Sequence, residues 1–327
     1  MKRLSCIYIV LTALFVALFV LNVCIGSQWF SPREIWQSVF ADTTTSQLIL
    51  SLRLPKAVTA ILAGMALSVA GVLLQTLFRN PLAGPYILGI NSGASLGVAV
   101  LTMLTISPVL TTAAFSVGIP LAALAGAAAV TLLMLSISRH IHSNVSLLIV
   151  GMMVGSVVGA LVTLIQNFAN PDSLKMFVVW TFGSLSGTGW NEIVVLVSVI
   201  AVAMVLLLFL LKPLNGLLLG EAYARALGVN IERARVCIVI VTSLLAGIVT
   251  AYCGPIAFVG VAVPHIARGL LRTTDHRKVI PVAMLLGANL LLACDCICAL
   301  FTYPLPISTV SALFGAPIII AIILRAR

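Results

Sequence analysis

Long apolar stretches make up most of the chain, and short polar segments separate them. A membrane-spanning helix needs roughly 20 apolar residues. By this measure the sequence contains ten predicted spans, at residues 4–25, 57–78, 87–106, 112–137, 146–168, 191–211, 236–252, 256–271, 279–301 and 308–324. The eighth fits least well, because it is short and contains Pro264. The pattern predicts an all-α integral membrane protein of about ten helices, with residues 1–327 forming a single transmembrane domain.

The composition agrees with this prediction. Hydrophobic residues make up 61% of the 327 residues and charged residues only 8%, whereas soluble proteins carry roughly 25% charged residues. So few charges cannot cover a water-facing surface, and the chain must therefore face lipid. The net charge of +10 would suggest nucleic acid in a soluble protein. In a membrane protein the position of Lys and Arg matters more than their sum, so we expect membrane lipid, and no nucleic acid, among the partners.

The basic residues divide unevenly between the two sides of the predicted bundle. If the N-terminus is cytoplasmic, fourteen of the 18 Lys and Arg residues fall on the cytoplasmic side. These are Lys2, Arg3, Arg79, Arg139, Lys212, Arg225, Arg233, Arg235, Arg268, Arg272, Arg277, Lys278, Arg325 and Arg327. The outer set is Arg33, Arg53, Lys56 and Lys175. Membrane proteins show a bias of this sign, and basic residues near both ends favour an even number of spans with both termini in the cytoplasm.

The N-terminus combines Met1-Lys2-Arg3 with an apolar run, as a signal peptide does. The run is long enough to span a membrane, and no Ala-x-Ala-like cleavage site follows it, so we interpret it as a retained first helix. The seven cysteines lie in or at the end of apolar runs, and no CxxC pair occurs. This placement favours ordinary packing of small side chains over disulfides or metal ligation.

Glycines recur at regular intervals in several predicted spans. The rows are Gly89, Gly93 and Gly97; Gly151, Gly155 and Gly159; and the looser Gly64, Ser68 and Gly71. Small residues at this spacing form a smooth helix face that a neighbouring backbone can approach closely. They predict a compact, glycine-packed bundle, with the lining of a transport pathway as the alternative.

The usual motifs for nucleotide binding and catalytic zinc do not occur. No lysine follows a glycine, which excludes a Walker A loop, and HExxH is absent. Gly-x-Ser-x-Gly occurs once, at residues 93–97, but it lies inside an apolar predicted span and not at the strand-to-helix turn that a nucleophilic serine of this motif occupies. The sequence therefore predicts a protein without catalytic residues, metal ligands or a bound cofactor of its own.

Two ionisable residues fall inside predicted spans and away from the span ends, whereas Glu192 and Arg268 lie near the ends of theirs. Asp295 is the one acid well within a span, and His265 follows Pro264 in the eighth. Such residues often mark ion pathways. We favour packing roles, with hydrogen bonds to neighbouring helices, and keep ion coupling through Asp295 and His265 as an alternative.

Residues 212–235 are the one long polar segment within this membrane-like sequence. At its centre is a helix-prone stretch, Leu218–Gly228, in which the i, i+4 spacing of Glu221 and Arg225 would allow an ion pair. Since the chain has neither a nucleotide site nor an evident ion relay, transport would need an outside source of energy. A soluble ATPase docking on this segment would supply it.

Short motifs of glycine, proline and charged residues occur over nearly the whole chain. They are Arg53-Leu54-Pro55-Lys56, Gly64 to Gly71 with Gln75, Arg79-Asn80-Pro81-Leu82-Ala83-Gly84-Pro85, Leu88-Gly89, Asn91-Ser92-Gly93-Ala94, Gly220-Glu221-x-x-Ala224-Arg225-x-Leu227-Gly228, Gly254-Pro255-Ile256-Ala257-Phe258-Val259-Gly260, Val263-Pro264-His265-Ile266-Ala267-Arg268, Asp275-His276-Arg277, Leu305-Pro306-Ile307-Ser308-x-Val310 and Gly315-Ala316-Pro317. In this order and spacing they resemble the permease subunits of the FecCD family, the membrane parts of ABC importers for ferric siderophores, haem and vitamin B12.

The resemblance implies a ten-helix permease that works with a second copy, as a homodimer, or with a close relative. Two cytoplasmic ATP-binding subunits, which hold ATP and Mg, and one external substrate-binding protein complete the assembly. The family's coupling helix, which would insert into a cleft on the ATPase, corresponds to Leu218, Gly220, Glu221, Ala224, Arg225, Leu227 and Gly228.

The resemblance also assigns docking of the binding protein to Arg53 and Lys56. Relatives often carry a further Arg shortly after the aspartate that matches Asp295, whereas residues 296–302 contain no basic side chain here. This departure predicts a weaker or differently arranged docking surface.

The cytoplasmic gate of relatives lies in the loop before the fifth helix, where His142-Ser143-Asn144-Val145-Ser146 stands here. Ser143, Asn144 and Val145 are the predicted gate residues. The pathway is expected between two copies, with a small and mildly polar lining. Its predicted residues are Gln75, Asn91, Ser92, Gln166 and Asn167.

These observations predict a multi-pass inner-membrane permease subunit of an ATP-driven importer, with a ferric siderophore as the expected cargo and haem or cobalamin as alternatives. An ion-coupled secondary transporter is a second hypothesis. A third is a structural membrane anchor for a cytosolic complex, which would leave the glycine-packed bundle and the external basic residues unexplained.

Overall fold

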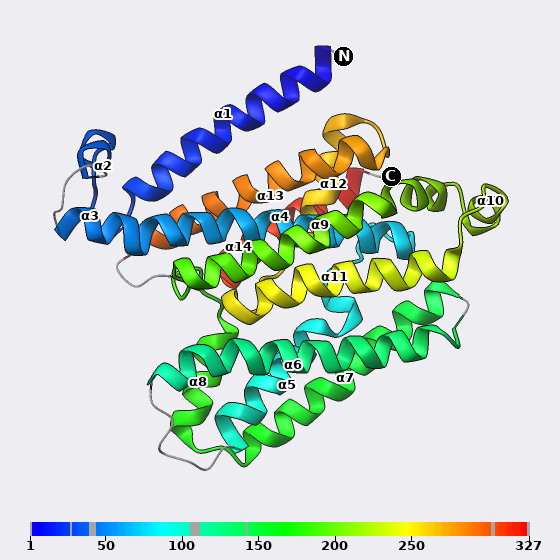
Figure 1. Cartoon of the computed structure of the whole chain (residues 1–327), viewed down its shortest axis with the longest axis horizontal. Coiled ribbons are helices and arrows are strands. Elements are labelled where there is room, and N and C mark those ends of the chain that lie inside the picture. Colours follow the sequence, from blue (N-terminus) through cyan, green and yellow to red (C-terminus); the bar gives the residue numbers. More distant parts are fainter. Residues whose placement is uncertain are drawn as a thin grey trace.

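The computed structural model describes residues 2–26, 28–38, 44–104, 112–141, 143–301 and 305–325. Within these ranges all regular structure is helical (Figure 1). The helices are α1 (Lys2–Cys24), α2 (Pro32–Ser38), α3 (Thr44–Leu48), the π-helix η1 (Ile49–Arg53), α4 (Leu54–Phe78), the 3-10 helix η2 (Pro85–Leu88), α5 (Ile90–Ala99), the π-helix η3 (Val100–Leu104), α6 (Thr112–Ser138), α7 (Asn144–Asn167), α8 (Pro171–Thr181), α9 (Trp190–Leu218), α10 (Glu221–Ala226), α11 (Ile231–Cys253), α12 (Val259–Leu271), α13 (His276–Ala299) and α14 (Ile307–Arg325). Of the residues named above, Met1, His142 and Arg327 lie outside the described ranges, as does residue 302.

Every predicted span coincides with helix in the described ranges. Seven helical segments are long and apolar enough to cross a membrane, and three shorter ones are apolar: Ile90–Met103, Val259–Leu271 and Ile307–Ala321. The all-α membrane fold is therefore confirmed, while ten crossings stay a prediction. The sequence did not predict α2 and α8, two short amphipathic segments between spans.

Several predicted boundaries are wrong. The second span belongs to a continuous helical segment from Ser46 to Phe78. The sixth continues to Leu218, because Pro213 is accommodated inside α9. Lys212 and Pro213 therefore belong to a long helix, and the separate polar module begins only after it.

The eighth span starts later than expected, at Val259. Gly254 ends α11 with φ +73°, the next residues are non-helical, and Phe258 caps α12 with φ +65°. A β-carbon on Gly254 would lie 2.6 Å from the carbonyl oxygen of Trp180. Glycine is therefore required here both by its positive φ and by a close backbone approach.

Helix α4 forms the centre of the bundle and α1 its edge. In the apolar window of α4 78% of the residues are buried, against 6% for α1. Helices α9, α11, α12 and α13 pack around α4, and α1 packs on α13 (Figure 1). A β-carbon on Gly64 would collide with the backbone of Gly287, and one on Gly71 with that of Gly260. The glycines of α4 therefore serve close packing, as the sequence predicted.

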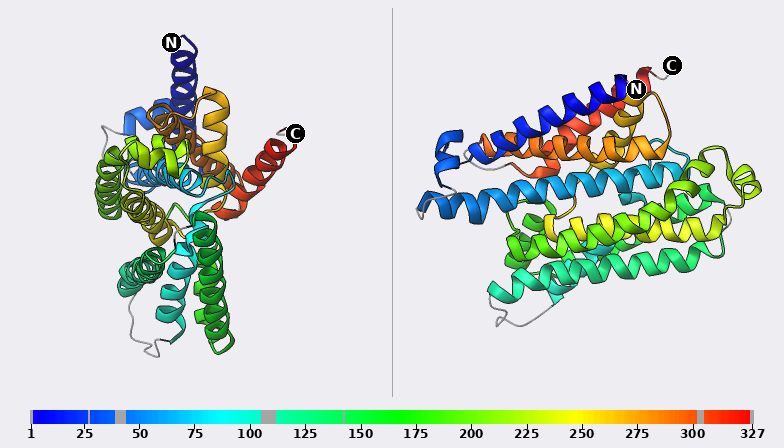
Figure 2. Two further views of the ribbon diagram at one scale, coloured as in Figure 1. Left: turned by 90° about the vertical axis from the view of Figure 1, so that its right-hand side faces the viewer. Right: turned by 45° about the horizontal axis from the view of Figure 1, so that its top comes forward.

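A second group of helices, α5, α6 and α7, packs beside this centre, mainly through α11. Gly97 of α5 would collide with the Ala122 carbonyl if it carried a β-carbon. In α7, however, only Gly151 meets backbone closely, at the Ile87 carbonyl, whereas nothing lies within 4 Å of a β-carbon on Gly159. The left view of Figure 2 shows α14 leaning outward from the bundle on the same side as α7, which packs on α5.

Hydrogen bonds show which helix ends lie together. At one end, here called the α10 end, Arg3 donates to the carbonyl of Leu270 and Arg79 to that of Leu218. Figure 1 shows both termini and α10 at this end. At the other, the α2 end, Trp190 donates to the Leu50 carbonyl. The α10 end carries the basic set that the charge distribution assigns to the cytoplasm.

Candidate functional site

The polar segment forms a short, sharply bounded helix at the α10 end. Gly220 precedes α10 with φ +110° and Gly228 follows it with φ +80°, conformations that favour glycine at both turns. Between them Ala224 is fully buried and packs against Gly216 of α9. This contact anchors α10 to the end of the long helix.

The opposite face of this segment is apolar and exposed. Leu219, Tyr223 and Leu227 are 63%, 53% and 54% exposed. These residues lie beyond the spanning part of α9, in a segment with charged neighbours, so lipid does not explain them. Large apolar side chains exposed to water mark interaction sites. The exposed face of α10 is therefore suited to contact with another protein.

Glu221, the first residue of α10, connects three parts of the molecule. Its Oε1 accepts a 2.7 Å hydrogen bond from Nδ2 of Asn144, at the start of α7. It also lies 3.5 Å from Nη2 of Arg235 in α11. The expected ion pair between Glu221 and Arg225 is wrong. Among the described residues Arg225 forms no ion pair and its side chain is exposed, because tertiary partners reach Glu221 instead.

The predicted gate residues lie at the N-terminus of α7. Ser143 is the N-cap, and its hydroxyl accepts from the backbone N–H of Ser146. Asn144 reaches Glu221, while Val145 is 64% exposed. Arg235 donates 2.6 Å to the carbonyl of Ile141, just before this cap. The structure thus joins the predicted gate directly to the predicted coupling helix.

A second connection joins the end of α9, just before α10, to the central helix. Arg79 ends α4 in the left-handed conformation (φ 49°), and its guanidinium donates 3.3 Å to the carbonyl of Leu218. One turn earlier, Gln75 donates to the Val261 carbonyl at 3.0 Å and accepts from Arg268 at 2.5 Å. Gln75, a predicted pathway residue, therefore bridges α4 and α12 and lines a cavity of about 240 Å³ beside Leu218.

A polar network that was not predicted from the sequence also lies at the α10 end. Asn215 of α9 donates to the Asp275 carboxylate at 2.9 Å and accepts from the backbone N–H of His276 at 3.0 Å. The buried His276 ring lies 2.7 Å from Asn215 Oδ1 and 2.8 Å from Thr76 Oγ1. The hydrogen bond from Asn215, and then that from the Arg277 N–H, lowers the pKa of Asp275. The Asp275-His276-Arg277 motif was the signal that could have revealed this link between α4, α9 and α13.

The remaining predicted pathway residues do not lie together. Asn91 lines a largely apolar cavity of about 440 Å³ between η2, the start of α12 and α14, and accepts a hydrogen bond from Thr250. Ser92 follows Asn91 and approaches Gly155 of α7. Gln166 and Asn167 lie in the last turn of α7, towards the α2 end. The structure therefore associates Asn91 and Ser92 and separates them from the other two.

At the α2 end, both predicted docking residues already have partners. Arg53 donates to the carbonyls of Val23, Cys24 and Gln28, and its guanidinium lies 4.4 Å from the centre of the Phe30 ring. These contacts fix the connection between α1 and α2. Arg53 therefore has a structural role whatever else it contacts.

Lys56 forms an ion pair with Asp295, with Nζ 2.9 Å from Oδ2. The lysine side chain is 23% exposed and the carboxylate side chain 5%. Asn22 donates a further 2.8 Å hydrogen bond to the same oxygen. Asp295 thus has the helix-neighbour contacts favoured for it above. A cavity of about 420 Å³ adjoins this pair.

The seven cysteines are free, and among the described residues no group of three His, Cys, Asp or Glu side chains is arranged to hold a metal ion. His265 is half-buried in α12 and has no hydrogen-bond partner within the part of the chain that the structure covers.

Comparisons with known proteins agree with the fold. The chain matches the model of the FecCD transport family over residues 14–325. It is 36% identical to the vitamin B12 import system permease protein BtuC of Vibrio cholerae, covering 96% of this chain and 92% of that protein. It is 33% identical to the hemin transport system permease protein HmuU of Yersinia pestis, over 92% and 90%. It is 34% identical to YvrB, an uncharacterized ABC transporter permease protein of Bacillus subtilis, over 90% and 85%.

The fold is also that of a solved structure, an inward-facing conformation of a metal-chelate type ABC transporter. The TM-score is 0.87 at 29% identity, with 98% of this chain and 99% of that chain covered. Together with the family match, this likeness accounts for the motifs and for nearly the whole chain. The protein belongs to the FecCD transport family and is a multi-pass inner-membrane permease of the ABC transporter type.

Proposed function

We propose that this chain is the transmembrane subunit of an ATP-driven importer that moves a ferric siderophore across the inner membrane between two copies of itself. The chain binds no cofactor of its own. ATP and Mg are held by two separate cytoplasmic subunits, and an external binding protein delivers the cargo. The observation that carries this proposal is the hydrogen bond between Asn144 and Glu221, which links the predicted gate to the predicted ATPase-docking helix.

In this proposal α10 is the coupling helix, with Leu218, Gly220, Glu221, Ala224, Arg225, Leu227 and Gly228 as its functional positions. The exposed Tyr223 and Leu227 enter the ATPase cleft, while Ala224 keeps the helix attached to α9. When the ATPases close on ATP, displacement of α10 acts on the start of α7 through Asn144. It acts on the end of α4 through the Arg79–Leu218 hydrogen bond.

The cargo would pass between two copies, along the flank that carries the cavity lined by Asn91, with Ser92 beside it. This flank includes α14 and α7, whose side chains Leu313 and Val157 are 66% and 63% exposed. The cavity wall is apolar apart from a few groups such as Asn91. Such a lining holds a large cargo weakly, so selection falls to the binding protein. Gln166 and Asn167 would line the external part of the same route. Gln75 would hold α12 in place through its hydrogen bonds to Val261 and Arg268.

Docking of the binding protein would use the α2 end. Lys56 is the better candidate there, because its ammonium is partly exposed beside a cavity, whereas Arg53 is committed to three carbonyls. An acidic side chain of the binding protein would share Lys56 with Asp295. This shared arrangement replaces the basic residue that is missing after Asp295.

The identity of the cargo is argued from the relatives. One relative carries the name of a hemin system and another that of a vitamin B12 system, and the solved structure is of a metal-chelate type transporter. All three cargos are large metal chelates, which a mostly apolar wall with few polar groups would hold weakly. We place ferric siderophore first, with haem and cobalamin as alternatives.

The test is purification of the chain from its native membranes in a mild detergent, with identification of what accompanies it. We expect an ATPase with a Walker A sequence and a second copy of the chain. The purified assembly, reconstituted with its binding protein in vesicles, should take up one of the three chelates when ATP is supplied. A chain that carries cargo without any ATPase would overturn the proposal and favour ion coupling.

A further inference from the structure

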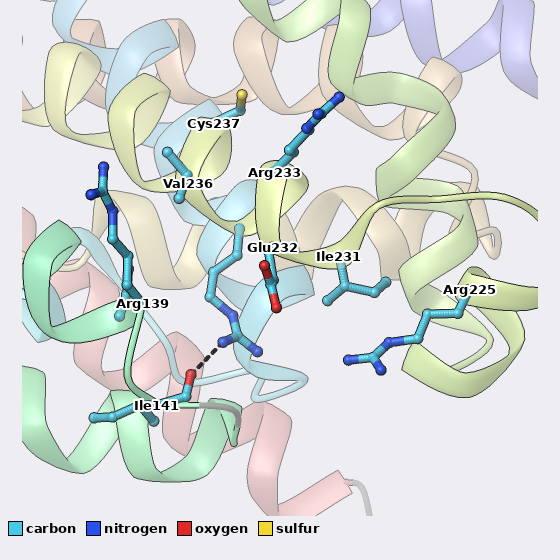
Figure 3. A pocket seen from close by; sticks show the side chains of 10 residues that line it. Arg139, Ile141, Arg225, Ile231, Glu232, Arg233, Val236 and Cys237 are labelled. Carbon is cyan, nitrogen blue, oxygen red and sulfur yellow. Dashed lines mark hydrogen bonds between the residues drawn. The ribbon is translucent and has the colours of Figure 1, made fainter.

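A pocket of about 510 Å³ opens at the α10 end, between the last turn of α6, the first two turns of α11 and Arg225 of α10 (Figure 3). Apart from Ile141, Arg225 and Arg235, none of its residues takes part in the coupling contacts described above. Its wall combines arginines with apolar side chains, among them Val236 and Cys237 of α11.

The pocket is rich in uncompensated positive charge. Its arginines are Arg139, Arg225, Arg233 and Arg235, and Glu232 is its one acid. Arg235 is engaged with Ile141 and Glu221. The side chains of Arg139, Arg225 and Arg233 form no ion pair or hydrogen bond with the described residues, and all three are exposed. An excess of planar guanidinium groups over carboxylates favours a phosphate ligand, which arginine binds through paired hydrogen bonds.

The two outer arginines also mark the edge of the lipid-facing surface. On α11, Arg233, Cys237, Ile240 and Leu244 are exposed or half-exposed at spacings of four, three and four, which places them on one helix face. On α6, Leu132, Ser136 and Arg139 form the corresponding exposed row. Helices α6 and α11 pack against each other, and Arg139, Arg233 and Cys237 line one pocket, so the two rows meet there. Each row ends in an arginine at the α10 end.

Figure 3 shows Arg139 and Arg233 on either side of Val236 and Cys237, both extending to the same side of the pocket, whereas Arg225 enters from another direction. A ligand held by Arg139 and Arg233 would therefore have its phosphate over the pocket and apolar parts along Cys237 and Ile240. These are the two halves of a phospholipid.

We infer that this pocket binds the headgroup phosphate of an anionic phospholipid, with the acyl chains lying along the groove between α6 and α11. The inference rests on the orientation proposed above, in which the α10 end faces the cytoplasm and the anionic headgroups of the inner leaflet. Basic pockets between spanning helices on this side of a membrane are known to hold acidic headgroups. Glu232 limits the charge that the pocket can accept and favours a single phosphate over a more highly charged ligand.

The test uses the purified full-length chain in a neutral detergent and measures bound lipid by native mass spectrometry. Dioleoyl-phosphatidylglycerol is the anionic probe and dioleoyl-phosphatidylcholine the neutral one. The pocket variant is R139Q with R233Q, which removes two exposed arginines and no coupling contact. The control is R277Q with K278Q, which removes two exposed positive charges at the same end but outside the pocket.

Wild-type and control chains are expected to retain phosphatidylglycerol in preference to phosphatidylcholine. The pocket variant should bind phosphatidylglycerol about 10-fold or more weakly, since each basic residue near an anionic surface contributes about 1 kcal/mol. Equal binding by the pocket variant and the control would overturn the inference. Complete competition by millimolar inorganic phosphate would identify a soluble anion as the ligand and would equally overturn it.

A third outcome separates this inference from the proposed function. If the pocket variant keeps its lipid preference but no longer purifies with the ATPase, the arginines form a protein-docking surface and the lipid inference is wrong. If Glu221→Lys abolishes ATPase-driven uptake while lipid preference is unchanged, the coupling role and the lipid pocket are independent, and both stand.

Discussion

Asn144 at the start of α7 donates a 2.7 Å hydrogen bond to Glu221 at the start of α10, across 77 positions of sequence. The first residue belongs to the predicted gate and the second to the predicted coupling helix. Arg235 holds the same carboxylate from the other side. A movement of α10 therefore cannot occur without either breaking this contact or moving the N-terminus of α7.

The Asn144–Glu221 contact should appear as a coupling energy. We expect Asn144→Ala and Glu221→Gln to be non-additive in a double-mutant cycle, by about 0.5–1.5 kcal/mol of unfolding free energy, the usual net contribution of one hydrogen bond. Thermal unfolding of the purified variants measures it. Ser146→Ala, at an exposed position two residues after Asn144, is the control. Strict additivity of the two variants would show that the contact carries no energy.

Removing the cation of the Lys56–Asp295 ion pair should lower the stability of the folded chain. Lys56→Met leaves a 5% exposed carboxylate without its cation, and we expect a loss of about 3 kcal/mol or more in unfolding free energy. Lys175→Met, at an exposed lysine of α8, should change the stability little. A stability of Lys56→Met equal to that of this control would show that Asp295 is not buried as an anion.

Asp295→Asn tests the ion-coupled alternative. In an ATP-driven permease this substitution leaves a neutral amide that can still bond to Asn22 and frees Lys56 for the binding protein. Uptake driven by ATP should therefore be largely retained in reconstituted vesicles. Loss of uptake in a folded Asp295→Asn chain, together with uptake by the wild type from an ion gradient alone, would support the alternative.

Asp275 should make stability depend on pH in the acid range. The pKa of Asp275 in the folded chain is lowered, chiefly by the hydrogen bond from Asn215. The pKa of an Asp in an unfolded chain is about 4. The carboxylate therefore contributes stability that is fully present above about pH 4 and is lost as the pH falls through the lower, folded value. Melting temperatures of wild type and Asp275→Asn should differ at pH 7 and converge below that range. A difference that does not change between pH 7 and pH 3 would contradict the assignment.

Gly71 of α4 and Gly159 of α7 both belong to the rows of small residues noted in the sequence, but they should differ in their tolerance of an alanine side chain. Gly71→Ala forces a β-carbon into the Gly260 carbonyl between α4 and α12, where neither backbone can yield, and should cost about 1–3 kcal/mol or prevent folding. Gly159→Ala meets nothing within 4 Å and should fold as the wild type does. If Gly159→Ala instead weakens self-association, α7 faces the second copy. Equal stability of the two variants would refute the close packing.

The long apolar helices could be predicted from the sequence because apolar length alone decides them, whereas the short α2 and α8 could not. The non-helical start of the eighth span was also accessible, since Gly254-Pro255 signals a break. What could not be predicted were the partners of polar groups far apart in sequence. Glu221 had a local candidate in Arg225, four residues away, yet the fold brings Asn144 and Arg235 to it.

The same limit applies at the other end of the bundle. Lys56 and Asp295 each drew attention in the sequence, but nothing in their spacing pairs them. Asn215 had no signal of its own, because a single amide in a polar segment is common, and its role follows only from the approach of α9 to α13. Roles in docking, gating and the pathway depend on surfaces between chains, and for these the positions of the residues are known while their functions stay predictions.

The most direct test of the coupling role of α10 is uptake by Glu221→Lys in vesicles that contain the ATPase and the binding protein. The new lysine would face Arg235 and lose the bond from Asn144. We predict that uptake falls about 10-fold or more while the chain stays folded and Glu221→Gln, which keeps an acceptor oxygen, retains a substantial part of it. Wild-type uptake and unchanged ATPase binding by a folded Glu221→Lys chain would contradict the account.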